Sequence, residues 1–302
     1  MTRKALAWSL LVFGGIATIG SYALIESRRH STSLTARIEQ IVPVGKHPEV
    51  PCVEVVANDP LVLLALGQSN AGNHGLPIVG VMEEVTMIAE GICIRASDPL
   101  PGGTGTGGSI WQRLPSLLSM EIDSRPIVLS VLAVDATSID DWTNPNSPLQ
   151  SRFASQVASM KRLGLSPNLV LWQQGEADAR MGTGKDDYAI GLGKLAATLN
   201  EIGVNAPIIL ARSTICGSSP SEAIRSAIEA TALSDHRFRL GPDTDALSDQ
   251  IFRNGCHLTA DGLDSAAKMW AATISAEVSA ISLTPLASFE SQNQHGFKRV
   301  IH

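Results

Sequence analysis

The sequence has 302 residues, of which 44% are hydrophobic and 17% are charged, and its formal net charge is −6. Because no Lys/Arg cluster interrupts the body of the chain, we expect no nucleic-acid partner, and the negative charge disfavours a strongly acidic polymer as substrate. Frequent glycine (26 residues) with few aromatic residues (4%) favours an α/β protein over an aromatic-rich β-sandwich.

Residues 1–25 have the pattern of an export signal. Arg3 and Lys4 precede an apolar run of about twenty residues, and Ser21–Ala23 resembles a small-x-small cleavage site. If it is not cleaved, the run is long enough to span a bilayer. We therefore expect an exported protein, secreted, periplasmic or anchored, whose only membrane contact is this segment.

Residues 26–58 are mixed and polar with three prolines, which predicts a linker ahead of a catalytic domain at 59–281. In that domain, short runs rich in Val, Ile and Leu, typical of strands buried on both faces, alternate with amphipathic segments. The expected strands are Leu61–Leu66, Ile127–Val134, Leu169–Trp172, Ile208–Ala211 and Phe238–Leu240. This alternation predicts a mainly parallel sheet of about five strands, covered by helices on both sides. Residues 282–302 lose the periodicity and are expected to form a flexible tail.

The first predicted strand leads into Gly67-Gln68-Ser69-Asn70-Ala71-Gly72. A serine among small residues at the carboxyl end of a strand can present its hydroxyl to a cleft, where the following backbone amides bind an oxyanion. The alternative is a glycine turn with an incidental serine. This loop differs from the G-x-S-x-G elbow of α/β-hydrolases, because Ala71 replaces the last glycine.

A serine nucleophile requires a base, and the chain has only seven histidines. Four of them lie in the predicted linker and tail, and His236 precedes the last predicted strand. His74 follows Ser69 closely on the same glycine-rich turn. His257 precedes the final amphipathic helix, where it can present an imidazole to the cleft, and is therefore the expected base.

A third polar stretch, Trp172 to Asp178, ends the third predicted strand. There, Gln174 can donate an amide hydrogen to an oxyanion, and Glu176 can orient the histidine. A solvated loop is the alternative interpretation. Asp178 and Asp245 are weaker candidates for the acid, and a Ser–His dyad without an acid remains open.

Taken together, these motifs resemble the signature blocks of the SGNH hydrolases. The resemblance is nearest to the sialate O-acetylesterase-like branch, which includes the acetylxylan-type enzymes of carbohydrate-esterase family six. It rests on Gly67–Asn70, Trp172 with Gln174–Glu176, and Cys256-His257, and it extends from about Asp59 to Ile281 through Gly103–Trp111, Ala133–Trp142 and Gly241–Asp245. The family implies a three-layer α/β/α, flavodoxin-like sandwich, no metal or other cofactor, and hydrolysis of O-acetyl esters, commonly on sugars.

Three positions depart from the pattern of this branch. Asp135-Ala136 precede Thr137 where the branch usually has Gly-Gly, which places a carboxylate near the developing oxyanion. Gln173 stands where histidine is frequent. Asn254 stands where the family often has an aspartate three residues before the catalytic histidine, and an asparagine cannot stabilise an imidazolium by charge.

The four cysteines contain no C-x-x-C pair, which argues against a zinc or redox motif. In an exported chain an even number permits two disulfides, with free buried thiols as the alternative. Because Cys216 follows the fourth predicted strand and Cys256 adjoins His257, we expect these two to be bonded. Cys52–Cys93 is then the remaining pair.

The sequence thus predicts a serine esterase acting through a Ser69 acyl-enzyme on an O-acetylated sugar or polysaccharide. The catalytic residues are Ser69, His257 and Glu176, and the oxyanion donors are the Ser69 amide, a backbone amide near Ala136 and the Gln174 side chain. Substrate contacts are expected from Gln68, Asn70, Thr137 and Asn254. The alternatives are a polysaccharide O-acetyltransferase with the same site and a non-catalytic carbohydrate-binding protein.

Overall fold

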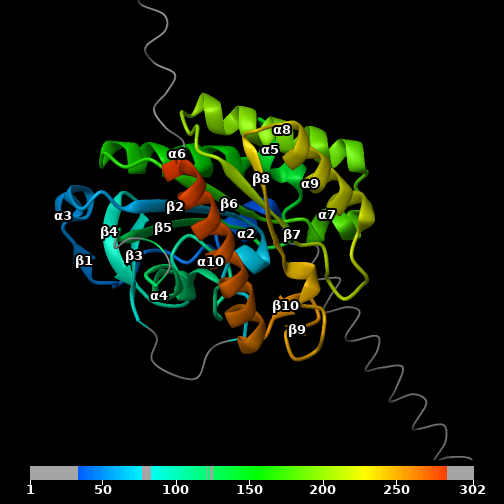
Figure 1. Ribbon diagram of the computed structural model, residues 1–302, viewed down its shortest axis with the longest axis horizontal. Helices are drawn as coiled ribbons and strands as arrows, with labels where there is room; N and C mark the ends of the chain where they lie inside the picture. Colours follow the sequence, from blue (N-terminus) through cyan, green and yellow to red (C-terminus); the bar gives the residue numbers. More distant parts are fainter. Residues whose placement is uncertain (1–32, 77–82, 121, 123–124, 284–302) are drawn as a thin grey trace, which may run out of the picture.

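The computed structural model describes residues 33–76, 83–120, 122 and 125–283. Its centre is one eight-stranded sheet with helices on both faces (Figure 1). Among the residues described, no helix has the length and apolar character needed to cross a membrane. The expected export segment lies outside them, as does nearly all of the expected tail.

Five neighbouring strands on one side of the sheet, up to its edge, are the five expected from the sequence, and all of them are parallel. Their order is the flavodoxin-like 2-1-3-4-5, in which the first strand lies between the second and the third. Their bounds are β2 Leu61–Gly67, β5 Ile127–Ala133, β6 Leu169–Gln173, β7 Ile208–Arg212 and β8 Phe238–Asp243. Every residue of β2, β5 and β6 is buried, as expected for strands covered on both faces.

The expectation of about five strands is wrong, because three more strands extend the sheet beyond β5. β3 (Val85–Ala89) and β4 (Ile92–Ala96) form an antiparallel hairpin, and β1 (Glu49–Val50) pairs with β4 at the edge. The hairpin turns at Glu90-Gly91, where both residues have positive φ. This pair lacks the usual Asn-Gly or Asp-Gly signature of such turns, which explains why the sequence pattern did not reveal it.

Helices cover the two faces of the sheet as separate layers. On one face, η2, α4 and α10 bury Trp111, Leu114 and Trp270 against the strands; on the other, α6, α8 and α9 bury Phe153, Tyr188 and Ile228 (Figure 1). The bounds on the first face are η2 Trp111–Arg113, α4 Leu114–Leu118 and α10 Ala260–Leu283. Those on the second are α5 Ile139–Thr143, α6 Pro148–Arg162, α7 Glu176–Met181, α8 Lys185–Glu201 and α9 Glu222–Ser234.

The segment expected to be a linker is structured over the part that is described, 33–58. It forms α2 (Leu34–Ile38), β1 and α3 (Cys52–Ala57), and a disulfide joins Cys52 to Cys93 on β4. Its prolines lie between these short elements rather than in a free connector. The folded unit therefore begins well before residue 59.

The order of the strands fixes where a ligand cleft belongs. The strands that follow β2 in the chain lie on both sides of it, β3 to β5 on one side and β6 to β8 on the other, so the carboxyl end of β2 is a topological switch point. In open parallel sheets, ligands bind in the crevice outside the carboxyl ends of the strands at such a point. The segment that leaves β2 at this end begins at Gln68 and carries Ser69.

Candidate active site

Ser69 begins the short 3-10 turn η1 (Ser69–Ala71) directly after β2. Gly67 makes this turn possible: its φ is +147°, and a Cβ there would collide with the carbonyl oxygen of Gln173 on β6. The Gln68 N–H donates to that same carbonyl at 3.2 Å. The close approach of the two strands therefore requires glycine, and it fixes the serine at the edge of the sheet.

Two backbone amides at this edge are available to an incoming group. Within the described part of the chain, neither the Ser69 N–H nor the Ala136 N–H has a hydrogen-bond acceptor. Ala136 lies in the loop after β5, which is the neighbour of β2, and has a left-handed φ of +52°. A non-glycine residue in this region carries strain of about 1–3 kcal/mol and is most frequent at functional sites.

His257 is brought to the same edge by a small hairpin. β9 (Arg253–Asn254) pairs with β10 (His257–Leu258) around the turn Gly255-Cys256, with φ +63° at Gly255. β10 packs against η1, and the His257 ring lies 5.1 Å from that of His74, measured between centroids. The structure thus places the expected nucleophile and the expected base on neighbouring segments.

Asn70, the residue after the expected nucleophile, ties the serine turn to the histidine hairpin. Its Nδ2 donates to the carbonyl oxygen of Cys256 at 3.0 Å and to Glu176 Oε1 at 2.6 Å. The Cys256 carbonyl also accepts from Arg253 Nη1 at 2.8 Å. Asn70, which was expected to contact substrate, therefore has its amide hydrogens engaged within the protein.

Glu176 is 1% exposed and does not bond to the imidazole directly. Its Oε1 accepts from Asn70 and from Ser213 Oγ at 2.7 Å, and its buried Oε2 has no partner among the described residues. The expectation that this carboxylate hydrogen-bonds the histidine is therefore corrected. Since Asn70 lies between the two, Glu176 acts on the backbone next to His257 rather than on its ring.

Burial raises the pKa of Glu176 to about 7, although the hydrogen bonds from Asn70 and Ser213 and the charge of Arg253 act in the opposite direction. In the unfolded chain this carboxyl titrates near its ordinary value of 4.5. Between these two pKa values the native state holds more protons than the unfolded state. Its contribution to stability is therefore lost as the pH rises from about 4.5 through about 7.

We expect Glu176→Gln to remove this part of the pH dependence. Relative to the variant, the wild type should lose up to about 3 kcal/mol of unfolding free energy between pH 4.5 and 7.5. Urea unfolding of both proteins at the two pH values measures the difference, and the other titrating groups cancel because both proteins contain them. Equal losses in both proteins would show that Glu176 does not titrate in this range.

Gln174 is not placed to stabilise an oxyanion, contrary to expectation. It is fully buried, and its Nε2 already lies near three acceptors: Asp178 Oδ2 at 2.6 Å, the Thr137 carbonyl at 2.9 Å and Gln68 Oε1 at 3.3 Å. Tyr188 donates to its Oε1 at 2.8 Å. A fully buried amide must satisfy its own hydrogen bonds, and here it fastens the loop after β5 to the β6 loop.

Two other residues expected to contact substrate take part in the same buried network. Gln68 accepts from the Ala177 N–H at 3.1 Å as well as from Gln174, and the Thr137 hydroxyl donates to the Val134 carbonyl at 2.7 Å. Trp142 Nε1 donates to the Thr137 hydroxyl at 3.0 Å. Both side chains therefore shape the loops around Ser69.

Thr104, which the sequence did not single out, links His74, the neighbour of the expected base His257, to the loop that carries Ala136. Its buried hydroxyl lies 3.0 Å from His74 Nε2 and accepts the Asp135 N–H at 2.9 Å. From α2, Arg37 Nη1 donates to the Asp135 carbonyl at 2.7 Å. Contacts on both sides of the Asp135 peptide thus hold the loop that presents the Ala136 amide.

The other departures from the family pattern also have structural explanations. The buried Gln173 amide donates to Ser213 and Thr244, and its oxygen accepts from Trp270 Nε1 at 3.0 Å. Asn254 is exposed and lies directly opposite His257 in the hairpin. Its neighbour Arg253 is instead the buried cation that braces this loop from inside.

The two weaker candidates for the acid hold the framework together. Asp178 accepts hydrogen bonds from the Ile139 N–H at 2.9 Å and from the Gln174 side-chain amide. Asp245 accepts the N–H groups of Thr214 and Ile215 and pairs with Arg225 at 3.0 Å. Neither bonds to the imidazole, since their oxygens are taken up by these contacts.

The structure contains both expected disulfides, and one of them joins the histidine loop to the loop after β7. Cys216–Cys256 and Cys52–Cys93 close sequence separations of 40 and 41 residues. Each closure should therefore stabilise the fold by a similar amount, about 3–4 kcal/mol in the chain-entropy model. Only Cys216–Cys256 adjoins the site.

We expect Cys216→Ser/Cys256→Ser to lower both stability and kcat, because the carbonyl that Asn70 and Arg253 hold belongs to Cys256. Cys52→Ser/Cys93→Ser is the matched control: it should lose a similar amount of stability, about 3–4 kcal/mol, with an unchanged kcat. Denaturant unfolding and initial rates on p-nitrophenyl acetate measure both quantities. Equal kcat losses in the two double variants would contradict a role of the bond in positioning His257.

The sequence analysis did not identify Arg253, Thr104 or the role of Asn70 in linking the serine turn to the histidine hairpin. Nothing in the local sequence marks the roles of Asn70 and Arg253, because Glu176 lies more than 100 residues from Asn70 and the acceptors of Arg253 are backbone carbonyls. The hairpin that carries His257 did have a local signal, since Gly255, with φ +63°, occupies the first position of its two-residue turn.

No family model matches the sequence, and no curated protein matches it either. Among solved structures, a protein from Arabidopsis thaliana is similar with a TM-score of 0.58 and 17% identity, over 71% of this chain and 97% of that one. That likeness is one of fold. The aryl esterase of M. smegmatis has a TM-score of 0.45 and 15% identity over 72% of this chain and 98% of that one. Est24, a carbohydrate acetylesterase from Sinorhizobium meliloti, has a TM-score of 0.43 and 14% sequence identity over 73% of this chain and 99% of that one.

Proposed function

We propose that this chain is a serine esterase of the SGNH-hydrolase type that removes short acyl groups, above all acetyl, from a carbohydrate. One observation carries the proposal. Ser69 lies at the switch point of the sheet, with the His257 hairpin packed against its turn and with two backbone amides at the same edge, those of Ser69 and Ala136, that have no acceptor among the described residues. Nucleophile, base and oxyanion donors are the groups that acyl transfer requires.

In the proposed acylation step, His257 takes the proton from the Ser69 hydroxyl while Oγ attacks the acyl carbon. The negative charge that develops on the acyl oxygen is stabilised by the N–H groups of Ser69 and Ala136. The alcohol leaves with the proton from His257, and water then attacks the acyl carbon while His257 takes its proton. The Oγ–acyl bond breaks, His257 returns the proton to Ser69 Oγ, and the free acid leaves. All these steps use groups of this chain, so the mechanism needs no metal or cofactor.

Glu176 and Asn70 have supporting roles in this proposal. Asn70 holds the Cys256 carbonyl and so fixes the backbone that carries the base, while Glu176 and Ser213 hold Asn70. Glu176 is thus a positioning residue. Arg253 contributes a second hydrogen bond to the same carbonyl and a positive charge near the carboxylate.

We expect Thr104→Val to lower kcat about tenfold to a hundredfold with KM nearly unchanged. The isosteric change leaves the Asp135 N–H without an acceptor and loosens the Ala136 amide, which acts only in the transition state. Thr104→Ser keeps the hydroxyl and should restore kcat. The matched control is Thr231→Val, a buried threonine on α9.

Steady-state kinetics of the three variants gives the comparison. If KM rose with kcat unchanged in Thr104→Val, or if Thr104→Ser were as impaired as Thr104→Val, the hydroxyl would have no part in positioning the loop.

The acetyl group and the sugar rest on the resemblance of the motifs to the sialate O-acetylesterase-like branch. The test is acetate release from a panel of acetylated xylan, acetylated chitosaccharides and O-acetylated peptidoglycan fragments, each assayed with and without an unacetylated sugar acceptor. Free acetate from at least one substrate supports the hydrolase. Acetyl transfer to the acceptor without free acetate would identify the transferase, and no turnover of any acyl ester would support a binding protein.

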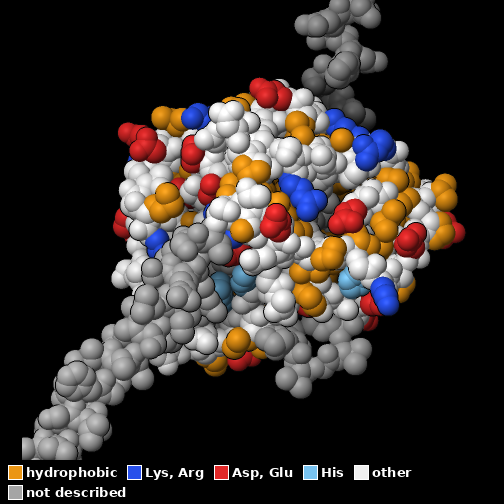
Figure 2. Space-filling view, turned by 180° about the vertical axis from the view of Figure 1, so that it is seen from behind, with side chains coloured by type: hydrophobic (Ala, Val, Ile, Leu, Met, Phe, Trp, Pro, Cys, Tyr) orange, Lys and Arg blue, Asp and Glu red, His pale blue; other side chains and the backbone are white. Residues whose placement is uncertain are grey.

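We further propose that the protein works outside the cytoplasm. Two disulfides suit an oxidising compartment, where such bonds form and persist. The expected export segment agrees with this. On the face of the molecule that Figure 2 shows, basic and acidic side chains are interspersed, which fits the expectation of no nucleic-acid partner.

A further inference from the structure

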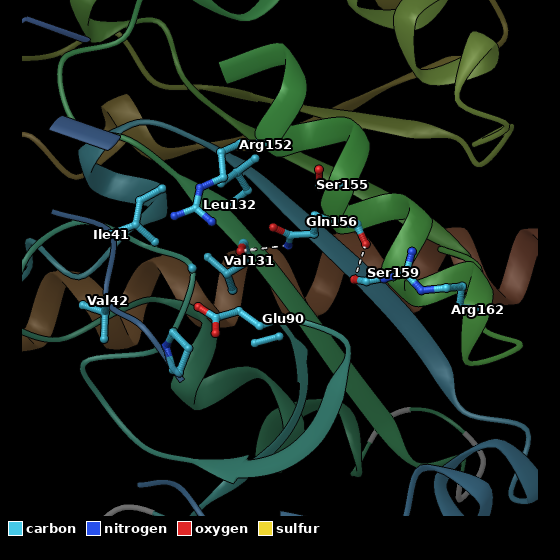
Figure 3. Close-up of a pocket in the computed structure, with 13 residues that line it drawn as sticks. Ile41, Val42, Glu90, Val131, Leu132, Arg152, Ser155, Gln156, Ser159 and Arg162 are labelled. Atoms are coloured by element: carbon cyan, nitrogen blue, oxygen red, sulfur yellow. Dashed lines mark hydrogen bonds between the residues drawn. The ribbon is translucent and has the colours of Figure 1, made fainter. Parts of the chain in front are cut away.

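A cavity of about 280 Å³ lies between α6 and the β3–β4 turn, and no residue that lines it belongs to the site around Ser69. Its size is near the lower end for small-molecule pockets, which span roughly 300–1,000 Å³. The floor is the carboxyl half of β5, where Val131 and Leu132 are buried. Ile41 and Val42 close one side with apolar surface (Figure 3), and Pro101 also lines the cavity.

The open edge of β5 explains why this space exists. β3 pairs with β5 only at Met87 and then turns away toward β4, so the next β5 carbonyls lose their strand partner. Gln156 of α6 replaces it, donating to the Val131 carbonyl at 2.9 Å and to Ser130 Oγ at 2.8 Å. Both amide hydrogens are used there, which leaves the Gln156 oxygen as an acceptor facing the cavity (Figure 3).

Three charged residues line the cavity: Arg152 and Arg162 of α6 and Glu90 of the β3–β4 turn. Figure 3 shows Arg152 reaching over it from α6 and Glu90 from the β3–β4 turn. Both side chains are exposed, and in the described part of the chain neither forms an ion pair or hydrogen bond, with the other or with any third residue. Their functional groups are therefore available to a ligand.

The backbone at Glu90 is unusual for its side chain. Glu90 has φ +51° in a two-residue hairpin turn, a position where Asn, Asp or Gly is strongly preferred. Glutamate at positive φ costs free energy that an asparagine there would avoid. An unfavourable residue whose carboxylate lines a cavity indicates a role for the carboxylate, and its Cα is held by the ladder of β3 and β4 on either side.

We propose that this cavity is a second, non-catalytic site that binds one unit of a neutral sugar chain. A simple anion would meet the Glu90 carboxylate, and a simple cation would meet Arg152 and Arg162. Vicinal hydroxyls both donate and accept, so they satisfy Glu90 and the Gln156 oxygen as acceptors and Arg152 as a donor. The apolar side lined by Ile41, Val42 and Pro101 suits the C–H face of a sugar ring.

This site does not depend on the esterase proposal, because none of its groups takes part in acyl transfer. If the chain does act on a polysaccharide, the cavity would hold that polymer at a distance from Ser69. Labelling of Ser69 and sugar binding at α6 are separate measurements. Either can fail without the other.

The test is a titration of the full chain carrying Ser69→Ala, followed by amide NMR shifts. The probes are xylotetraose and N-acetylchitotetraose, each to about 10 mM. Sodium sulfate and glucuronate are titrated separately as anionic comparison ligands. We expect at least one tetrasaccharide to give saturable shifts at residues 89–91 and along α6. Arg152→Met and Glu90→Gln should each weaken this binding about tenfold, as expected for the loss of one charged hydrogen bond.

Arg95→Met is the matched control, since Arg95 is an exposed arginine on β4 that bonds to Thr86 outside the cavity. It should bind as the parent does. Three results would overturn the proposal: no saturable shift at the cavity with either tetrasaccharide, binding by Arg152→Met and by Glu90→Gln as tight as that of the parent, or sulfate alone producing the same shifts more tightly than the sugars.

Discussion

Replacing Ser69 by alanine should lower kcat by at least about 10^4 and leave the fold intact, because nucleophile and base act as one unit. The Ser69 hydroxyl makes no hydrogen bond to any described residue, so its removal leaves no buried partner unsatisfied. Initial rates on p-nitrophenyl acetate and a thermal melt measure both effects. Ser130→Ala is the control: this serine is also buried, but its hydroxyl bonds to Ile88 within the sheet, so only stability should change.

Residual activity of Ser69→Ala within about tenfold of the wild type would contradict the assignment of the nucleophile, given the size of the expected loss. A comparable loss in Ser130→Ala would show that the assay reports folding rather than chemistry.

Replacing His257 by alanine should do similar damage, since without its base the serine hydroxyl is a poor nucleophile. The double variant Ser69→Ala/His257→Ala should be no worse than either single variant, as is typical of residues that act as a unit. The neighbouring imidazole provides a matched comparison. His74 lies beside His257 with the ring centroids 5.1 Å apart, but it is directed to Thr104 rather than assigned to the proton transfer.

His74→Ala should therefore cost no more than about tenfold in kcat, the size of effect expected from losing its hydrogen bond with Thr104. If His74→Ala were inactive and His257→Ala nearly normal, the base would be His74. Circular dichroism of both variants establishes that they are folded before their rates are compared.

Much of the fold was predictable because burial on both faces leaves a clear mark in sequence. Four of the five parallel strands, β2, β5, β6 and β7, consist mainly of Val, Ile, Leu and Ala, and the two long helices Lys185–Glu201 and Ala260–Leu283 carry apolar residues at helical spacing. The β3–β4 hairpin on the other side of the sheet left a weaker mark in the sequence. Val85–Ala89 and Ile92–Ala96 are short and partly exposed, and Glu90-Gly91 is an uncommon turn pair, so pattern alone did not separate them from loops.

The segment before residue 59 was misjudged for a related reason. Its helices Leu34–Ile38 and Cys52–Ala57 have only five and six residues and bury no residue fully, so neither shows a clear apolar stripe. They are kept in place by long-range contacts, among them the bond from Cys52 to Cys93 and the hydrogen bond from Arg37 to the loop after β5. Contacts of this kind are invisible to local periodicity.

For the site, the sequence pointed to segments more reliably than to individual roles. The loops that carry Ser69, Gln174 and His257 do gather at one edge of the sheet, because parallel strands present their carboxyl ends together. The role of each amide and carboxylate depends on which atoms it reaches. Gln174 proved to be fully bonded inside the protein, and Glu176 reaches the histidine loop only through Asn70.

The central claim is that Ser69 is the nucleophile activated by His257, and covalent labelling tests it most directly. The full chain is treated with a fluorophosphonate, digested and analysed by mass spectrometry, beside Ser69→Ala and His257→Ala. The account predicts one phosphonylated residue, Ser69, with labelling abolished in Ser69→Ala and slowed by at least about a hundredfold in His257→Ala. An unlabelled wild type, or a label on another serine that persists in Ser69→Ala, would contradict it.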